Sequence, residues 1–260
     1  MMENIKKIDL LGLTNFPLVK PGDNIASLII ESCKKSNIEI KDQDIFVITQ
    51  KIISKSENRY RTLSNIKPRF RAKYFSWISG KDPRFVQLVL DESNQVLRAK
   101  KNTLIVEHKN GFICANAGID HSNTDPQSEN TEDAYLLLPK NPDFSADSIR
   151  KKIESESQKR IGVLIIDSHG RAWRNGTIGM AIGISGIPGL VDLRGYEDLF
   201  GFKLRITMVA AADELAGAAS LLMGQAKEGI PVVIVRGFPY QLREGKISEL
   251  IRPKKEDLFR

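Results

Sequence analysis

Three short apolar runs limit how this chain can fold. They are "DIFVITQ" at residues 44–50, "IGVLII" at residues 161–166 and "PVVIVRG" at residues 231–237. Each run is rich in β-branched residues and shorter than an ordinary helix, and polar or turn-forming residues bound it. This combination is typical of a buried strand. A sheet is therefore expected at the centre of the fold.

The remaining elements decide the fold class. Two further β-rich runs at residues 103–120 flank Asn110-Gly111, the dipeptide preferred in type I′ turns, and predict a hairpin. Ile8–Leu13 is predicted as another strand. Helical spacing predicts four helices: one capped by Asp23 that continues to Cys33, one beginning at Pro83, one capped by Ser145 that runs to about Lys159, and one at residues 212–224 that ends at Gly224. Hairpins mixed with strand–helix units favour an α+β fold over a doubly wound sheet.

Other segments carry weaker patterns. Residues 121–144 are rich in Ser, Asn, Asp and Pro and predict a long, exposed loop around "AYLLLP". Residues 176–201 are punctuated by glycine, and we expect little regular structure there. Lys203–Ala210 alternates like a strand, and the charged end from about Arg243 is expected to be exposed.

Composition narrows the class of partner. The 260 residues include 41% hydrophobic and 27% charged residues, without a signal peptide or an apolar stretch long enough for a membrane span, which predicts a cytoplasmic protein. Cys33 and Cys114 lie too far apart to suggest a disulfide or zinc motif. We expect both to be buried.

The net charge of +7 would suit nucleic acid or phosphorylated ligands, but it can also follow from a lysine-rich composition. The basic residues are scattered, and only the cluster at residues 67–73 has aromatic neighbours, Phe70, Tyr74 and Phe75. A base-stacking platform would look like this, but we expect these rings on the buried side of a surface helix. We attribute the positive charge mainly to composition and secondarily to an anionic ligand, and we expect no nucleic-acid partner.

Asp167-Ser168-His169 contains the three residue types of a hydrolase triad. Neighbouring residues of an extended chain point to opposite faces, so Ser168 cannot easily take its base from His169. A triad is normally assembled from distant positions, and the chain has no G-x-S-x-G elbow. The triad interpretation is therefore poor.

Two aspartates are better candidates for chemistry. Asp120, after "NAGI", and Asp167, after "GVLII", each end a predicted strand and precede Ser or His. Carboxylates held on rigid elements are the oxygen ligands that a divalent cation requires. The alternative is that each carboxylate caps the turn after its strand. The pattern itself leaves both interpretations open.

A nucleotide site would need an unusual phosphate cradle. Neither G-x-x-x-x-G-K-[ST] nor G-x-G-x-x-G occurs in the sequence. "TQKIISK", where Lys51 and Lys55 leave the end of a strand, and "MGQAKEGIP", which follows a helix, are the candidate segments. A lysine there would act as a flexible point charge for phosphate.

Five segments together resemble a known family. They are "NFPLVKPGDN", "TQKIISKSENR", "NAGIDHSN", "IIDSHGRAWRNGTIGMAIGISG" and "ADELAGAASLLMGQAKEGIPVVIVRG". Their order and spacing resemble those of the F-420 gamma-glutamyl ligases over about residues 8–238. One departure is "SKSENR", where Asn58 replaces a turn glycine but still tolerates a positive φ.

The resemblance implies a GTP-dependent ligase that joins L-glutamate to the precursor of the deazaflavin coenzyme F420. GTP would phosphorylate a carboxylate, and the glutamate amine would then displace phosphate. It also implies magnesium or manganese, potassium as an activator, and an intertwined homodimer with a two-domain α+β fold. We expect a ligase-like domain at residues 1–242, with about residues 80–200 as its second subdomain, and a charged tail at residues 243–260.

The resemblance also assigns residues. Its metal ligands are Asp120, Asp167, Ser168 and Gln225, where Gln225 replaces a carboxylate common in the family and would weaken or reshape a second metal site. Its GTP contacts are Phe16, Pro17, Leu18, Val19, Gln50, Lys51, Lys55, Asn123, Gly224, Gln225, Ala226, Lys227, Glu228, Gly229, Ile230 and Pro231. From charge and placement we add Arg171 and Arg174 as catalytic clamps for the acceptor's phosphate or carboxylates, beside Asp167.

Two alternatives remain. The same fold and reaction could serve a different phosphorylated carboxylate, because the residues that select the acceptor lie outside the matched motifs. A basic, non-catalytic nucleotide- or nucleic-acid-binding protein is the alternative from another class, and it predicts salt-dependent binding without turnover. The scattered charge and the pair Asp120 and Asp167 argue against the second alternative.

Overall fold

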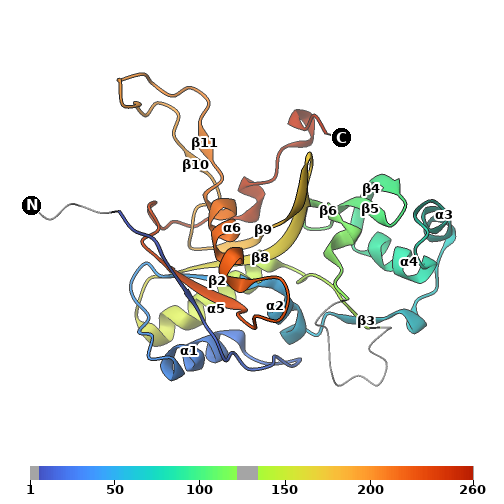
Figure 1. Ribbon diagram of the computed structural model, residues 1–260, viewed down its shortest axis with the longest axis horizontal. Coiled ribbons are helices and arrows are strands. Elements are labelled where there is room, and N and C mark those ends of the chain that lie inside the picture. The colour runs from blue at the N-terminus through green and yellow to red at the C-terminus, as the bar shows by residue number, and fades with distance from the viewer. Residues whose placement is uncertain (1–5, 122–133, 260) are drawn as a thin grey trace, which may run out of the picture.

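A five-stranded sheet forms the centre of the computed structural model, which describes residues 6–121 and 134–259 (Figure 1). In spatial order its strands are β1 (Asp9–Gly12), β12 (Val232–Arg236), β2 (Ile45–Thr49), β8 (Gly162–Arg171) and β9 (Arg174–Ser185). Only β2 and β8 are parallel to each other, and the other neighbours are antiparallel. The expected α+β fold with mixed sheets is confirmed.

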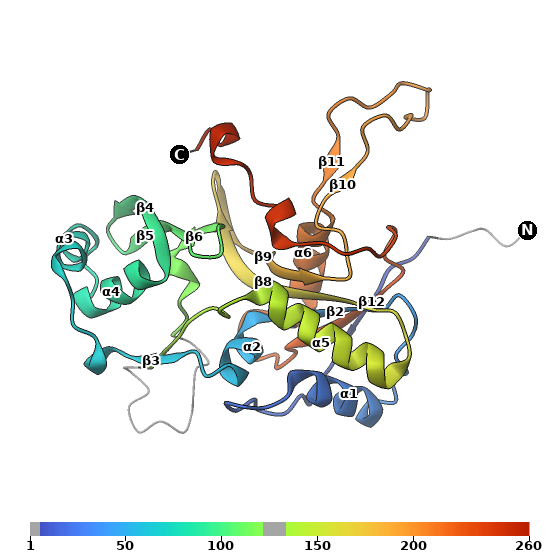
Figure 2. The same cartoon turned by 180° about the vertical axis from the view of Figure 1, so that it is seen from behind.

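Helices cover both faces of this sheet, which explains why β12, most of β2 and the first half of β8 form unbroken apolar runs. Helices α1 (Ile25–Lys35) and α5 (Pro142–Ser157) cover one face, where Phe46, Val163 and Ile234 are fully buried. Helix α6 (Ala211–Met223) covers the other face, where Val47, Leu164 and Val235 are fully buried. Figures 1 and 2 show these two helical layers.

A third core lies beside the sheet in what we call the small lobe, residues 60–121 and 134–137. Its elements are β3 (Tyr60–Thr62), the 3-10 turn Leu63–Asn65, α3 (Phe70–Ser79), α4 (Pro83–Asp91), β4 (Ser93–Lys100), β5 (Thr103–His108) and β6 (Ile113–Ala115), and β7 (Ala134–Leu136) pairs with β3. This core extends from Leu63 to Leu137. The predicted subdomain boundaries near residues 80 and 200 remain a prediction.

An extended arm, residues 190–210, leaves the sheet layers (Figures 1 and 2). Strands β10 (Val191–Asp192) and β11 (Met208–Val209) pair at its base, and farther along the arm Glu197 and Lys203 form an isolated β-bridge. The prediction of a strand over Lys203–Ala210 was therefore wrong for most of its length. Ile206 is 86% exposed, so the apolar alternation has no neighbouring layer to pack against.

Strand β9 is the largest error of the prediction. Residues 176–201 were expected to be irregular, yet β9 has 12 residues. Its glycines allow the helices to approach: a Cβ added at Gly179 would lie 2.5 Å from the carbonyl oxygen of Ala216 in α6. One added at Gly183 would lie 2.5 Å from Pro142 in α5. Glycine in a strand can mark such a close approach instead of a loop.

Some predicted helix boundaries were displaced by local hydrogen bonds. Asn24, and not Asp23, caps α1 by accepting the Ser27 N–H. Helix α5 begins at Pro142, and its cap is Asn141, four residues before the predicted cap Ser145. Gly224 does end α6, with a φ of 71°.

The hairpin of the small lobe is confirmed, but its turn is not. Strands β5 and β6 pair from Ile105 to Glu107, and the His108 N–H donates to the Phe112 carbonyl across the loop. Gly111 has a positive φ and Asn110 does not, so the turn is not type I′. The predicted strand ending at Asp120 is instead a 3-10 turn at Asn116–Gly118, followed by a bridge between Asp120 and Leu136.

The C-terminal residues include two 3-10 turns, Ile247–Glu249 and Lys254–Glu256. Ile247 is buried against the core beneath α6, so the end from Arg243 is not exposed throughout. The structure contains, within residues 6–121 and 134–259, no helix that has both the length and the apolar character needed to cross a membrane.

The close contact at Gly183 gives a stability prediction. Gly183→Ala should destabilise the fold by about 1–3 kcal/mol, because the new methyl group meets the backbone of Pro142. Gly217→Ala in α6, where no atom lies within 4 Å of the added Cβ, should be neutral or stabilising. Urea denaturation of both variants measures the difference. Equal stability would contradict this account of β9.

Candidate functional site

A polar cleft of about 330 Å³ opens where the sheet meets the small lobe. Its walls come from the end of β2, the segment before Asp120, the middle of β8 and the loop after α6. The lining residues are Thr49, Lys51, Ala115, Asn116, Gly118, Ile119, Asp120, Asp167, Ser168, His169, Gly170, Met223, Gly224, Gln225, Ala226, Glu228 and Gly229. The cleft therefore joins four of the five segments that the sequence singled out.

The cleft forms because two parallel strands differ in length. Pairing between β2 and β8 ends at Thr49 and Ile166, and the chain then turns into α2 (Gln50–Ser56). Strand β8 continues to Arg171 on β9 alone, so its edge toward β2 is open from Asp167 onward. The prediction that Asp167 ends its strand was therefore wrong. Asp167 is the first residue beyond the parallel pairing.

Asp120 is held by two residues from the start of α2. Its Oδ2 accepts hydrogen bonds from Gln50 Nε2 at 2.5 Å and from Lys51 Nζ at 2.6 Å. Burial raises the pKa of Asp120 above its ordinary value, Lys51 opposes this rise, and the Asp167 carboxylate adds to it. The two carboxylates predicted as a pair are therefore close enough to repel each other.

The loop after α6 supplies neutral donors and acceptors to the cleft. Ser168 Oγ donates to Gln225 Oε1 at 2.9 Å. Gly224 and Gly229 both have a positive φ, and the exposed Glu228 accepts the Ala226 N–H. That hydrogen bond lowers the pKa of Glu228. The loop is thus a tight turn that places Gln225 against β8.

His169 lies behind Asp167 on the same face of β8. Its Nε2 is 3.0 Å from Asp167 Oδ2, and its side chain is only 6% exposed. Phe112 of the small lobe packs on the His169 ring at 5.6 Å, and the ring of His108 stacks on Phe112 at 5.0 Å. Sequence analysis left His169 without a role, although two-residue spacing in a strand could have placed it beside Asp167.

The donors in the cleft fit a hard divalent cation. Asp120, Asp167, Ser168 and Gln225 offer only oxygen, as magnesium and manganese prefer, and two repelling carboxylates favour a cation between them. Across the described part of the chain, no group of three or more His, Cys, Asp or Glu residues could hold a metal. Any such site must therefore use the hydroxyl and amide oxygens as well.

The other assigned residues divide into two groups. Lys51, Gly224, Ala226, Glu228 and Gly229 line the cleft, and the buried Gln50 contacts it through Asp120. Several do not line it: Phe16, Pro17, Leu18, Val19, Lys55, Arg171, Arg174, Lys227, Ile230 and Pro231. Asn123 lies outside the described residues. Asn58 has the positive φ that was expected, 53°.

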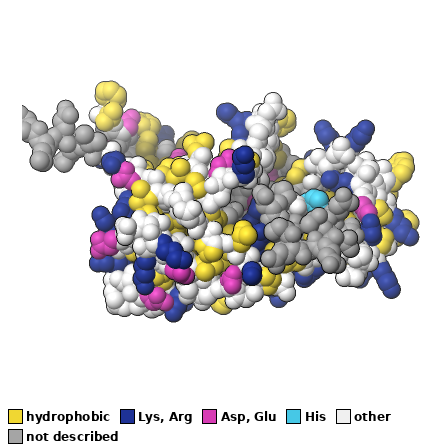
Figure 3. Space-filling view, turned by 60° about the horizontal axis from the view of Figure 1, so that its bottom comes forward, with side chains coloured by type: hydrophobic (Ala, Val, Ile, Leu, Met, Phe, Trp, Pro, Cys, Tyr) yellow, Lys and Arg dark blue, Asp and Glu magenta, His cyan; other side chains and the backbone are white. Residues whose placement is uncertain are grey.

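The aromatic residues of α3 differ from expectation. Phe70, Tyr74 and Trp77 form a stripe on the exposed side of the helix, and Phe70 is 84% exposed. The prediction that Phe70 and Tyr74 lie on the buried side was wrong. It was correct for Phe75, which packs with Ala72 at the core of the small lobe. Figure 3 shows basic and apolar side chains mixed at this end of the molecule.

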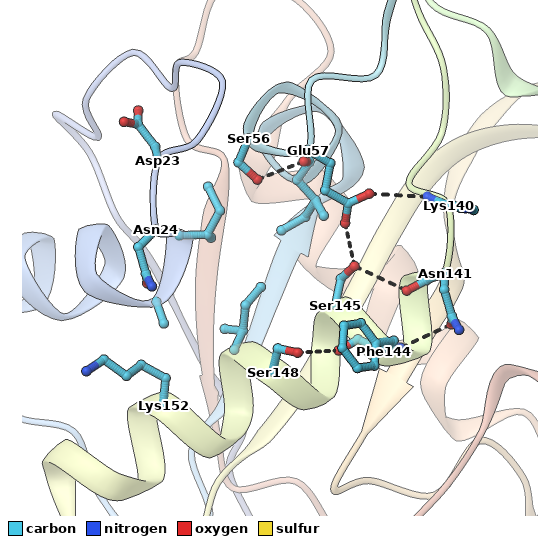
Figure 4. A pocket seen from close by; sticks show the side chains of 14 residues that line it. Asp23, Asn24, Ser56, Glu57, Lys140, Asn141, Phe144, Ser145, Ser148 and Lys152 are labelled. Atoms are coloured by element: carbon cyan, nitrogen blue, oxygen red, sulfur yellow. Dashed lines mark hydrogen bonds between the residues drawn. The ribbon is translucent and has the colours of Figure 1, made fainter.

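A second hollow of about 570 Å³ lies between the start of α1, the end of α2 and the start of α5 (Figure 4). The Glu57 side chain lies in this hollow, where its carboxylate accepts hydrogen bonds from Ser145 Oγ and the Lys140 N–H. Its walls are mainly apolar, including Ile25, Ile53 and Ile149. These contacts connect α2 to α5, and neither Asp120 nor Asp167 lines this hollow.

Fold and cleft together define an α+β protein with a cleft lined by carboxylate, hydroxyl and amide oxygens beside a glycine-bounded loop. The model of the F420-0:Gamma-glutamyl ligase family matches residues 14–237, and the chain belongs to this family. It is 45% identical, over the full length of both chains, to the coenzyme F420:L-glutamate ligase of Methanocaldococcus jannaschii. It is 42% identical to the protein of that name from Methanothermobacter thermautotrophicus, over 97% of this chain and 99% of that one.

His108 gives a prediction about pH. Burial lowers its pKa from 6.5 to about 4, so the folded protein keeps this ring neutral while the unfolded chain takes up a proton below about pH 6.5. Stability should therefore fall as the pH drops from 6.5 toward 4. Between pH 7 and pH 5 this one group costs about 2 kcal/mol.

The measurement is the unfolding free energy at both pH values. His108→Leu should reduce the loss between pH 7 and pH 5 by that amount, whereas His121→Leu, at an exposed histidine, should leave it unchanged. An unaltered pH dependence in His108→Leu would show that another group is responsible.

Proposed function

We propose that the cleft catalyses the GTP-dependent ligation of L-glutamate to the precursor of coenzyme F420. The carrying observation is that Asp120, Asp167, Ser168 and Gln225, from three distant segments, line one cleft in a chain of this ligase family. Relatives named coenzyme F420:L-glutamate ligase match the whole chain, which supports the acceptor and the amino acid.

The chemistry explains why charge neutralisation matters here. A carboxylate is a poor electrophile, so a terminal carboxylate of the precursor attacks the γ-phosphorus of GTP and GDP leaves. The glutamate amine then attacks the acyl phosphate carbon, losing a proton, and phosphate departs as the amide forms. Phosphoryl transfer of this kind depends mainly on positioning and on balancing the phosphate charge.

Each side chain has a role in this scheme. A magnesium or manganese ion held by Asp120, Asp167, Ser168 and Gln225 would supply charge neutralisation at the phosphates. Lys51, 2.6 Å from Asp120, is a mobile cation that can turn to a phosphate oxygen. Gln50 keeps Asp120 in place, and its own Oε1 accepts from Ser54.

The remaining assignments complete the proposal. GTP would extend from the cleft over residues 224–231 and toward Lys55 and the loop at residues 16–19, with Asn123 as a further contact. Arg171 and Arg174, beyond the cleft at the turn between β8 and β9, would bind the acceptor's phosphate or carboxylates. Potassium as an activator and a cytoplasmic location belong to the same proposal.

Loss of either carboxylate should stop turnover. Asp120→Asn and Asp167→Asn should each lower glutamate-dependent release of GDP by at least about 100-fold. Each variant removes a ligand of the cation that would balance the charge of the phosphates. Asp9→Asn, in a surface ion pair with Lys7, is the matched control and should retain full activity. Full activity in Asp167→Asn would exclude the assigned role.

The acceptor is tested directly. Protein, GTP, manganese, L-glutamate and the deazaflavin precursor are incubated, and mass spectrometry looks for added glutamate. Hydrolysis of GTP with another acid, and no glutamate on the precursor, would favour the alternative acceptor. Salt-dependent binding of polynucleotides without turnover would favour the nucleic-acid alternative.

The arm supports a homodimer as part of the proposal. Its exposed apolar residues are Tyr196, Leu199, Phe200, Phe202, Ile206 and Met208, and Leu199 is 97% exposed. An apolar segment that projects from its own core is stabilised if a second copy covers it.

This proposal predicts a change of mass. The double variant Leu199→Asp, Phe200→Asp should shift the protein from dimer to monomer in light scattering after gel filtration. Leu221→Asp, an exposed leucine on α6, is the control and should leave the dimer intact. A monomeric wild-type protein, or a dimeric double variant, would contradict the assignment of the arm.

A further inference from the structure

His169 is a buried polar residue that the proposed reaction does not yet use. It lies two residues after Asp167 on β8, so strand geometry places both side chains on one face. The contact between Nε2 and Asp167 Oδ2 is 3.0 Å, and both side chains are largely removed from solvent. Since Asp167 is a carboxylate, the ring nitrogen that faces it is the one that donates.

The small lobe fixes the orientation of this ring. Phe112 lies in the loop between β5 and β6 and packs on His169, with His108 stacked behind it at an angle of 3°. Phe112 also contacts the core of the sheet and that of the small lobe. The His169 ring is thus clamped between Asp167 and a side chain of the other lobe.

A role as a catalytic base does not fit this geometry. Ser168 points to the opposite face of β8 and donates to Gln225, so His169 has no hydroxyl to activate. What the ring does contact is one oxygen of a carboxylate that lines the cleft. Outer hydrogen bonds of this kind orient carboxylate ligands and tune cation affinity.

We propose that His169 is a positioning residue, which donates from Nε2 to Asp167 Oδ2 and so directs the Oδ1 side of that carboxylate to a divalent cation. The inference rests on the proposed cation site. Phe112 would then link the small lobe to the cation site, because it packs on the His169 ring and that ring orients the Asp167 carboxylate.

The test measures the binding of Mn²⁺ to the full chain, with and without GDP. Electron paramagnetic resonance reports the concentration of the free ion. His169→Leu should weaken Mn²⁺ binding by about 10-fold or more. His169→Gln should restore most of it, since its amide nitrogen can reach the position of Nε2. His169→Asn should not, because its amide is one bond shorter.

His108→Leu is the matched control, since His108 is equally buried and stacks on the same Phe112. It should leave Mn²⁺ affinity within about twofold of wild type even if the melting temperature falls. Equal affinity in wild type, His169→Leu and His169→Asn would overturn the inference while leaving the cation site in place. Equal weakening in His169→Gln and His169→Asn would also overturn it, and absence of binding in wild type would remove the cation site itself.

Discussion

The parallel pairing of β2 with β8 is the constraint on which the cleft depends. It ends at Thr49 and Ile166, and everything beyond that point follows from the difference in strand length. Helix α2 turns away and carries Gln50 and Lys51 to Asp120, while β8 continues with an open edge. Side chains from both faces of β8 can therefore line one cleft, Asp167 from one face and Ser168 from the other.

The two lobes contribute unequal parts to this cleft. The sheet supplies a rigid base that is buried on both faces, and the small lobe supplies Asp120 and the aromatic ring of Phe112. Lys51 lies beside the Asp120 carboxylate and offsets part of the rise in its pKa that burial causes.

Glycine has opposite meanings in two parts of the chain. Gly224 and Gly229 adopt positive φ values and form the turn that places Gln225. Gly179 and Gly183 lie in a regular strand, where the absence of a Cβ admits α6 and α5. The prediction that Gly224 ends the helix was correct, and the prediction of irregular structure from the glycines of residues 176–201 was wrong, because the close approach of a helix leaves no local signal in the sequence.

The sequence by itself determined the three central buried strands and the class of fold, because apolar periodicity is a local property, and it named Asp120 and Asp167 as candidates for one site. The tertiary structure alone decided that Phe112 of the small lobe packs on the His169 ring, and that Arg171 and Arg174 lie beyond the cleft. It also decided that Phe70 faces solvent. These outcomes depend on which surfaces meet when the lobes and the sheet pack, and no spacing along the chain encodes such a contact.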